Sequence, residues 1–437
     1  MSVALFSSIF YSKYVEVVVL LSVLLPGSVC ALYKNSIYLE DIFSASNDMN
    51  VPLIFMAISL TLLIFLASWA IPGALYSATL LVLLFILSMC FSTSNLLWFY
   101  IMFESSLLPI LFMIVGWGYQ PERLQAGLYM ILYTVLGSMP LLIIILYMYY
   151  DMCTLNFYLL PLIPNLSDAF LTLGFLAFLV KLPVYSLHVW LPKAHVEAPL
   201  GGSMILAGVL LKLGGYGLYV YGSLGSWCLT NFGYVFLVCL SVWGGFYASI
   251  VCLSQMDIKS MIAYSSIVHM SLVVLGIMSN TAWGFSCALI TMVAHGWASS
   301  ALFLIAYITY EKVGSRSFNY TKGLLSVFPI LGYLWFILVA VNMSVPPTIN
   351  LVGELCGIPV AMWMNLWLLF VLLLTLFISV AYNMYLYSKV NHGLVSMLIL
   401  SGKGLSSRAL LAAVGHLLPL FLLLSMPLIS PCTGNCM

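Results

Sequence analysis

Six ionisable side chains in this sequence lie inside long apolar runs. They are two acids, two lysines and two histidines: Glu104, Lys181, Lys212, His269, His295 and Glu354. A charged side chain at bilayer depth costs roughly 2.5–3.5 kcal/mol on insertion scales, so such residues usually serve a function. Carboxylates, desolvated lysines and histidines can each take up and release a proton. A set of them spread over several segments is typical of a proton relay.

The strongest candidate site lies in LAFLVKLPVYSLHVWLPKAHVEAPLGG, residues 176 to 202. Lys181 stands in an otherwise apolar run, and Pro183 follows two residues later. Proline has no N–H, so the carbonyl of Leu179 loses its helical partner and the helix is expected to break beside the charge. Broken helices with a charge at the break form ion sites in many transporters. We expect Glu104 to be the partner of Lys181, loading the lysine when close and unloading it when distant.

Spacing predicts three polar stripes on helix faces, along which side chains and water would pass protons. The stripes are Lys181–Tyr185–His188 (if the helix continued through Pro183), Lys212–Tyr216–Tyr219 and Thr291–His295–Ser299. After the first stripe comes an exposed-looking cluster of Lys193, His195 and Glu197. We expect His195 and Glu197 to be loop or capping residues rather than catalysts.

Each of these residues also has a plainer interpretation. Glu104 and Lys181 would equally form a static buried ion pair that fixes helix packing. A single buried histidine is more often a satisfied core residue than a relay group. Lys212 lies ten residues before Gly222, about 15 Å at the helical rise, so its side chain does not easily reach water. The number of costly groups favours the relay over a static scaffold.

Composition identifies the class of protein. Apolar residues make up 64% of the 437 residues and charged residues 6%, against about 25% charged in soluble proteins. This is a membrane protein, and its net charge of +1 argues against a nucleic-acid partner. The ten cysteines show no CxxC, and Cys432 and Cys436 favour two free thiols over a disulfide. Because no iron–sulfur, haem or zinc spacing is present, we expect neither a metal nor a cofactor.

Apolar stretches of about 20 residues predict thirteen transmembrane spans. The spans are 15–32, 51–70, 74–94, 95–115, 124–150, 168–191, 199–222, 231–252, 260–279, 283–307, 325–361, 364–387 and 409–429. Segment 1–12 is apolar but short, and whether it forms a fourteenth span stays open. The stretch 325–361 is too long for one straight helix, and Pro346 and Pro347 divide it into one discontinuous crossing.

A repeat is visible in this order of spans. Two sets of five spans each carry a proline-broken fourth span, and each broken span holds one buried ionisable residue, Lys181 or Glu354. Five is an odd number, so the second set must be inverted, which is typical of transporters. The fold class is therefore all-α, with about 13–14 transmembrane helices, two inverted five-helix repeats and two discontinuous helices. The expected divisions are 1–73 (N-terminal helices), 74–222 and 223–390 (the two repeats) and 391–437 (C-terminal helix and tail).

The number of spans between two loops decides whether they lie on the same side of the membrane, and the loop charges agree with the sides that thirteen spans give. Loops on one side (116–123, 192–198, 253–259, 308–323 and 388–408) hold nine basic and four acidic residues. Loops and span ends on the other side hold one basic and five acidic residues: Lys34, Glu40, Asp41, Asp48, Asp151 and Asp168. Basic loops face the side on which the chain is made. The basic loops 312–322 and 389–408 would also suit contacts with anionic lipids, but the topology signal alone explains their charges equally well.

Several longer motifs resemble a known family. They are FYIMFESSLLPI (99–110), WGYQPERLQAGLYMILYTVLGSMPLL (117–142), VKLPVYSLHVWLPKAHVEAPLGGSMILAGVLLKLGGYG (180–217), SQMDIKSMIAYSSIVHMSL (254–272), MVAHGWASSALF (292–303) and PPTINLVGE (346–354). From about residue 95 to 390 the chain resembles the chain 4 family of mitochondrial NADH–ubiquinone oxidoreductase, complex I. It is also similar to subunits of multisubunit sodium/proton antiporters, but KAHVEAP and QPERL favour complex I. The first ninety residues match poorly, and the family usually has fourteen spans.

The resemblance implies a proton-translocating subunit of the complex I membrane arm, in the mitochondrial inner membrane. It implies other membrane-arm subunits as partners, including neighbouring antiporter-like subunits, while NADH and ubiquinone act elsewhere in the complex. The matching positions imply that Glu104 pairs with the broken-helix lysine Lys181 and that Lys212 is the central relay lysine. His269 and His295 would lie along the relay, and Glu354 would be its terminal carboxylate.

Three functions remain open from the sequence. The first is a proton-translocating subunit that couples redox energy to pumping without a redox centre of its own. The second is a subunit of a sodium/proton antiporter, and the third is a membrane scaffold whose polar residues only lock packing. Replacing Lys181 separates the third from the others, because a scaffold would still pump.

Overall fold

A computed structural model of the chain describes residues 14–33, 49–68, 73–157, 168–223, 232–396 and 404–422. Several predictions lie outside these residues: those on segment 1–12, on Lys34, Glu40, Asp41, Asp48 and Lys403, and on Cys432 and Cys436.

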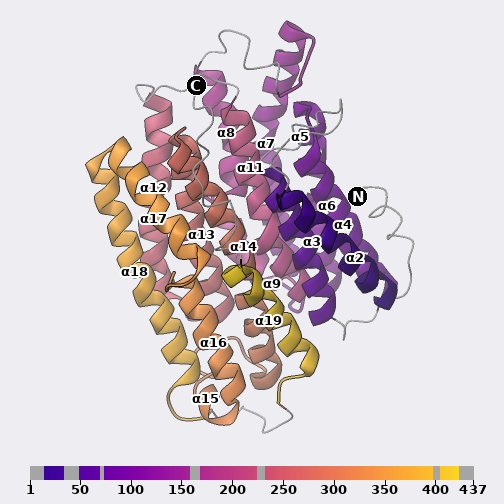
Figure 1. Cartoon of the computed structure of the whole chain (residues 1–437), viewed down its shortest axis with the longest axis vertical. Coiled ribbons are helices and arrows are strands. Elements are labelled where there is room, and N and C mark those ends of the chain that lie inside the picture. The colour runs from indigo at the N-terminus through magenta and orange to yellow at the C-terminus, as the bar shows by residue number, and fades with distance from the viewer. Residues whose placement is uncertain are drawn as a thin grey trace. The chain divides into compact units, whose positions relative to one another are not determined.

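The part of the chain that the structure describes is built from helices, as the sequence predicts (Figure 1). Nine helices there are long and apolar enough to cross a membrane, and five shorter apolar helices accompany them. Each of the thirteen expected spans contains at least one helix. The all-α membrane fold is therefore confirmed.

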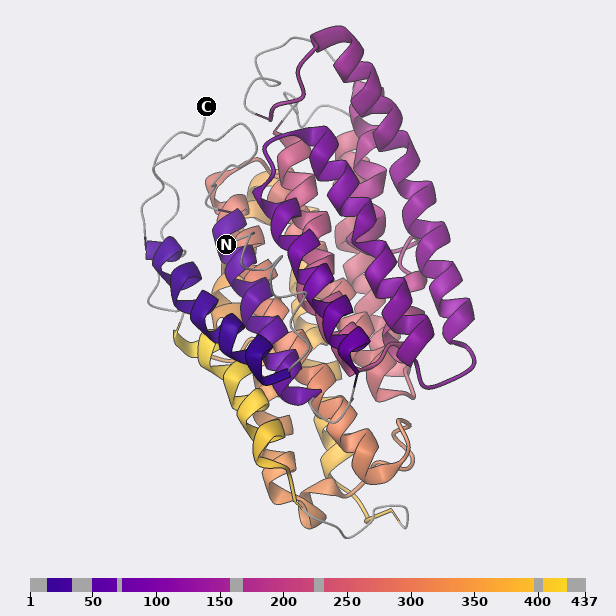
Figure 2. The ribbon, with the colours of Figure 1, turned by 90° about the vertical axis from the view of Figure 1, so that its right-hand side faces the viewer.

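The chain folds into two compact units, of which the first comprises residues 1–183 and 197–237. Its helices are α2 (Tyr14–Tyr33), α3 (Asn50–Ala67), α4 (Ala74–Ser92), α5 (Leu96–Ser105), α6 (Leu107–Trp117), α7 (Arg123–Met152), α8 (Asp168–Lys181), α10 (Leu200–Ile205), the π-helix η2 (Leu206–Leu210) and α11 (Leu211–Gly222). The long α7 packs against both α6 and α8 (Figure 2). Only a third of its most apolar stretch is buried, whereas 94% of the most apolar stretch within Leu200–Gly222 is buried. The α10–α11 crossing is therefore the core of this unit, and α7 is one of its outer helices.

The second unit comprises residues 184–196 and 238–437. It holds most of α9 (Trp190–Glu197) and α12 (Phe232–Ser254), with α13 (Ile258–Met278), α14 (Ala282–Val313), α15 (Leu324–Val327), α16 (Pro329–Asn342), α17 (Ile349–Met364), α18 (Leu366–Asn391) and α19 (Ser407–Leu422). Helix α14 contacts α13, α16, α17 and α19, and its most apolar stretch is completely buried. The polar residues within that stretch of α14 are thus shielded from lipid.

Both predicted helix breaks are present. Helix α8 ends at Lys181, and the next helix, α9, starts at Trp190. Helix α16 ends at Asn342, and α17 starts at Ile349 after Pro346 and Pro347. Lys181 therefore ends the first half of its broken helix, whereas Glu354 lies in the second half of the other.

The two units share matching local features, which support the repeat. In each unit the second span of the repeat begins after a residue that forms an isolated antiparallel bridge with the loop following the third span: Asn95 with Asn156, and Asp257 with Ser317. In each, a buried cysteine thiol approaches the carbonyl oxygen nine residues later, Cys90 to Phe99 at 3.9 Å and Cys252 to Met261 at 4.0 Å. These contacts are weak individually, but their recurrence at the same places indicates one architecture used twice.

Loops that the charge pattern assigns to one side contact one another in the second unit. The guanidinium Nε of Arg316 lies 3.5 Å from a carboxylate oxygen of Asp257, and Lys312 donates to the carbonyl of Gly404. Lys259 donates to the carbonyl of Val196. These contacts link four of the five loops predicted on the basic side, so the grouping is consistent with the structure.

Candidate functional site

The structure places the six candidate residues in two groups. Glu104, Lys181 and Lys212 belong to the first unit, and His269, His295 and Glu354 to the second. The exposed fraction of every one except Glu104 is 9% or less, and Glu104 is partly exposed. The two groups are described separately below.

The ammonium group of Lys181 is held by Phe103. Its Nζ donates to the Phe103 carbonyl at 2.7 Å and lies 3.2 Å from the centre of the Phe103 ring. A desolvated cation–π contact is worth about 2 kcal/mol or more. The carboxylate of Glu104 is close enough for an electrostatic interaction with Lys181, but among the described residues no ion pair within 4.0 Å joins them. The expected partner is thus nearby, without an ion pair that joins it to the lysine within 4.0 Å.

A helix interruption lies beside this site. Helices α5 and α6 are separated at Ser106, where the sequence predicted one continuous span. Pro109 explains the interruption, because it cannot donate to the carbonyl of Ser105 four residues earlier. The Ser106 hydroxyl donates to the Phe103 carbonyl at 2.7 Å, so that carbonyl accepts from both Ser106 and Lys181. Glu104 therefore lies in the last turn before an irregular point, as Lys181 does.

Close packing brings α11 against the end of α8. A Cβ atom added to Gly214 would lie 2.9 Å from Leu182 Cγ and 3.2 Å from Lys181 Cβ. Only glycine permits this approach without displacing the neighbouring chain. This tight packing at Gly214 places the Lys212 helix directly beside the Lys181 break.

Lys212 lies just after a π-helical turn that the sequence did not predict. The N–H of Leu211 bonds to the carbonyl of Leu206, five residues earlier, instead of to Ala207, four residues earlier. The Lys212 ammonium donates to that Ala207 carbonyl at 2.6 Å, and its side chain is fully buried. Such π-bulges occur frequently at functional sites. Lys212 does not snorkel, because it turns back into its own helix.

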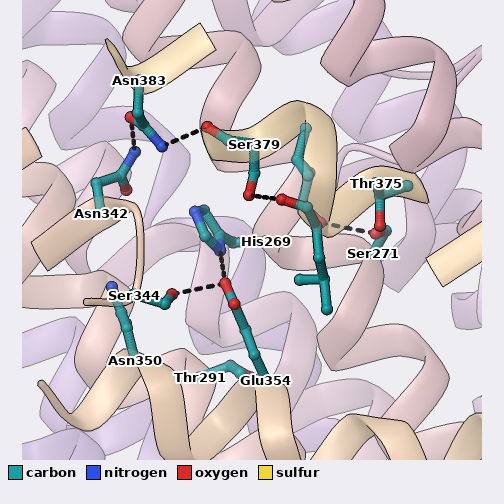
Figure 3. A network of polar contacts seen from close by, with 12 residues as sticks. His269, Ser271, Thr291, Asn342, Ser344, Asn350, Glu354, Thr375, Ser379 and Asn383 are labelled. Atoms are coloured by element: carbon teal, nitrogen blue, oxygen red, sulfur yellow. Dashed lines mark hydrogen bonds and ion pairs between the residues drawn. The ribbon is translucent and has the colours of Figure 1, made fainter. Parts of the chain in front are cut away.

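In the second unit, His269, Glu354 and His295 form one buried group, of which Figure 3 shows His269 beside Glu354. His269 Nδ1 lies 3.7 Å from Glu354 Oε1, and the ring centres of His269 and His295 are 5.2 Å apart. Ser344 from the break donates to the same Glu354 oxygen at 2.7 Å. Helices α13, α14 and α17 thus bring two histidines and a carboxylate together, which is an arrangement that can pass a proton.

Gly353 sets the spacing of α14 and α17 next to Glu354. A Cβ added there would lie 2.6 Å from Thr291 Cγ2 and 3.3 Å from the Thr291 backbone nitrogen. We expect Gly353→Ala to destabilise the protein by about 1–3 kcal/mol through overpacking. Thermal unfolding of the purified complex measures this loss of stability as a lower unfolding temperature than that of the native complex. The control is Gly116→Ala in α6, where nothing lies within 4 Å of the added atom, and equal stability of both variants would contradict the prediction.

One prediction from the sequence is wrong. His195 and Glu197 do not form an exposed cluster in a loop, because both are buried and belong to α9. His195 stacks on Phe303 with ring centres 4.5 Å apart, which is a long-range contact that local spacing does not reveal.

The stripe Lys181–Tyr185–His188 depended on the helix continuing through Pro183. It does not form on one helix, because α8 ends at Lys181, at the expected break.

The stripe of Thr291, His295 and Ser299 lies on one continuous buried helix face, as predicted. Its hydroxyls donate to carbonyls of their own helix: Thr291 to Cys287, and Ser299 to His295.

Sequence reasoning missed the uncharged polar residues around Glu354. Asn342 donates to Asn383 at 2.9 Å, and both are buried. Asn350 donates to the Val341 carbonyl at 2.9 Å. Their signal in the sequence is an asparagine inside an apolar run, which a search for charged residues alone does not find.

Comparisons with known proteins agree with this architecture. Residues 93–379 match the family model described as NADH:quinone oxidoreductase/Mrp antiporter, TM. The chain is 46% identical over 374 residues to NADH-ubiquinone oxidoreductase chain 4 of Albinaria caerulea, covering 85% of this chain and 86% of that one. It is 41% identical over 381 residues to the protein of the same name from Rhipicephalus sanguineus, covering 86% of each.

Two solved structures have the same fold. A chain of respiratory complex I from Thermus thermophilus with bound NADH superposes with a TM-score of 0.87 at 23% identity, covering 98% of both chains. A chain of the archaeal membrane-bound sulfane sulfur reductase superposes with a TM-score of 0.84 at 19% identity, covering 96% of this chain and 74% of that one.

Proposed function

The chain belongs to the NADH:quinone oxidoreductase/Mrp antiporter family, and within it to NADH-ubiquinone oxidoreductase chain 4. We propose that it translocates protons in the membrane arm of NADH:ubiquinone oxidoreductase, and that a buried Glu/Lys/His relay couples redox energy to pumping. The chain carries no redox centre, and NADH and ubiquinone react elsewhere in the complex. Its place is the mitochondrial inner membrane, beside other antiporter-like subunits and lipids.

The observation that carries this proposal is the group of His269, His295 and Glu354. All three are buried. The two ring centres are 5.2 Å apart, and His269 Nδ1 is 3.7 Å from Glu354 Oε1, so a bridging water or a small side-chain movement would let a proton pass from each group to the next. A static scaffold gains little from such a group, since replacing buried ions with apolar residues is often neutral or stabilising. A relay requires groups that change charge.

In the first unit the same function is assigned to Glu104, Lys181 and Lys212. Lys181 and Lys212 are both buried, and the ammonium of each donates to a backbone carbonyl. Burial disfavours the charged form of a lysine, so a buried lysine can release its proton more readily than one in water. Glu104, next to the Phe103 carbonyl that holds Lys181, is the group that controls this step.

Glu354→Gln tests the proposal in the purified complex reconstituted into vesicles. The amide keeps the size of the side chain but cannot titrate, so we expect proton pumping to fall at least about tenfold while the complex still assembles. Electron transfer from NADH to ubiquinone is measured in parallel and should slow with it. The matched control is Glu311→Gln, at an exposed carboxylate in the last turns of α14. Undiminished pumping by Glu354→Gln would remove Glu354 from the relay.

A further inference from the structure

The turn that ends α16 has an unusual residue at its key position. The N–H of Val345 bonds to the carbonyl of Ala340, and the N–H of Ser344 to that of Val341, each at 3.1 Å. This double pattern is the Schellman motif, in which the residue after the C-cap adopts the left-handed conformation and is usually glycine. Here that residue is Ser344, with φ of 61°. A side chain is strained in this region, whereas glycine is not.

The hydroxyl of Ser344 reaches the candidate relay carboxylate. Its Oγ donates to Glu354 Oε1 at 2.7 Å, and both side chains are buried. His269 Nδ1 approaches the same oxygen, at 3.7 Å (Figure 3). One carboxylate oxygen thus accepts a hydrogen bond from a neutral donor in the break, and a titratable ring from α13 lies close to it, beyond hydrogen-bond distance.

The turn is also braced from both neighbouring helices. Asn350, in the first turn of α17, donates to the Val341 carbonyl at 2.9 Å across the break. Asn342, the last residue of α16, donates to Asn383 of α18 at 2.9 Å. The position of Ser344 is therefore held by bonds that do not involve its own side chain. The conformation of the turn does not need the hydroxyl, and the strain of a serine there has no local benefit.

We propose that Ser344 is a positioning residue for proton transfer: the turn aims its hydroxyl at Glu354 and holds the carboxylate oxygen toward His269. This inference rests on the proposed relay through Glu354. A glycine would suit the turn better, so the serine is explained by what its hydroxyl contacts. Without that donor, Glu354 would turn freely about its side-chain bonds, and the oxygen facing His269 would no longer be fixed.

The decisive variant is Ser344→Gly, studied in the purified and reconstituted complex. It removes the hydroxyl and also relieves the left-handed strain, so assembly and thermal stability should be equal to or greater than native. We expect proton pumping nevertheless to fall about tenfold, as for the loss of a hydrogen bond to a charged group. A purely structural role predicts the reverse pattern, with pumping unchanged. The matched control is Ser326→Gly in α15, whose hydroxyl donates only to the carbonyl of Gly323 in its own turn.

A spectroscopic readout follows the contact itself. The carbonyl stretch of the Glu354 carboxyl is identified in infrared difference spectra by its absence in Glu354→Gln. We expect it to move to higher frequency in Ser344→Gly, because a hydrogen bond to the carbonyl oxygen is lost.

The outcomes separate the two proposals, the relay through Glu354 and the positioning role of Ser344. Native pumping by Ser344→Gly, with pumping lost in Glu354→Gln, would overturn the role of Ser344 and leave the relay standing. Native pumping by both variants would overturn the relay as well. Failure of Ser344→Gly to assemble would overturn the conformational premise, since a Schellman turn accepts glycine. Reduced pumping by a stable Ser344→Gly complex, with the infrared shift, would support the inference.

Discussion

Replacing Lys181 by alanine should abolish most proton pumping and slow electron transfer from NADH to ubiquinone, with the complex still assembled. The expected loss of pumping is about 100-fold, at the lower end of what a positioned acid–base group contributes. Assembly should survive for two reasons. Removing a desolvated ammonium offsets the loss of its contact with the Phe103 ring, because burying such an ion costs several kcal/mol. The Phe103 carbonyl also keeps a donor, the hydroxyl of Ser106 at 2.7 Å.

The measurement uses the reconstituted complex, with pumping and electron transfer assayed side by side. Lys181→Met serves as a second variant that fills the space of the lysine stem without its charge. Lys389→Ala is the control, because this lysine is exposed near the end of α18. If Lys181→Ala and Lys181→Met pumped normally, Lys181 would be a packing residue and the scaffold interpretation would be correct.

Lys212→Met should produce the second large effect, again on pumping rather than on assembly. The variant leaves the Ala207 carbonyl without the ammonium that donates to it at 2.6 Å, at a cost of about 1–3 kcal/mol. Relief of the buried charge is of similar or larger size, so the fold should persist. We expect pumping to fall at least about tenfold, because the relay would lose the titratable ammonium group of Lys212 in the core of the first unit.

A closely matched control is available for this variant. Lys259 also donates to a backbone carbonyl, that of Val196 at 3.4 Å, but it lies in the first turn of α13, at the loop end of its span, whereas Lys212 lies in the middle of its span. Lys259→Met should therefore leave the pumping rate close to native. Equal loss in both variants would show that the effect comes from disturbed packing and not from the position of Lys212.

Much of the fold was predictable because lipid imposes simple rules. Twenty apolar residues in a row mark a span, so the helices appear where the sequence predicts them. Proline removes a backbone donor, so the breaks after Lys181 and Asn342 appear beside Pro183 and before Pro346. The burial of Lys181, Lys212, His269, His295 and Glu354 follows from the same argument, since each stands within an apolar run.

Other features depend on contacts that no local pattern encodes. The π turn before Lys212 is a change in hydrogen-bond register, and its residues are ordinary helix-compatible ones. The left-handed turn at Ser344 lacks the glycine that usually signals it. His195 is buried because Phe303, more than a hundred residues away, stacks on it. The interruption at Ser106 follows from Pro109, which stands in the middle of the predicted span 95–115 and in the first turn of the helix that begins after the interruption.

The two broken helices have a consequence for how such a chain can change in evolution. Helix α8 ends at Lys181, and its counterpart α16 ends at Asn342. A charged residue closes one broken helix and a neutral amide closes the other, yet both breaks form. The break is therefore a property of the backbone and its prolines, independent of the residue that occupies its end. A duplicated ancestor with this architecture could exchange the charge at one copy without rebuilding the bundle, which leaves each half free to acquire its own chemistry.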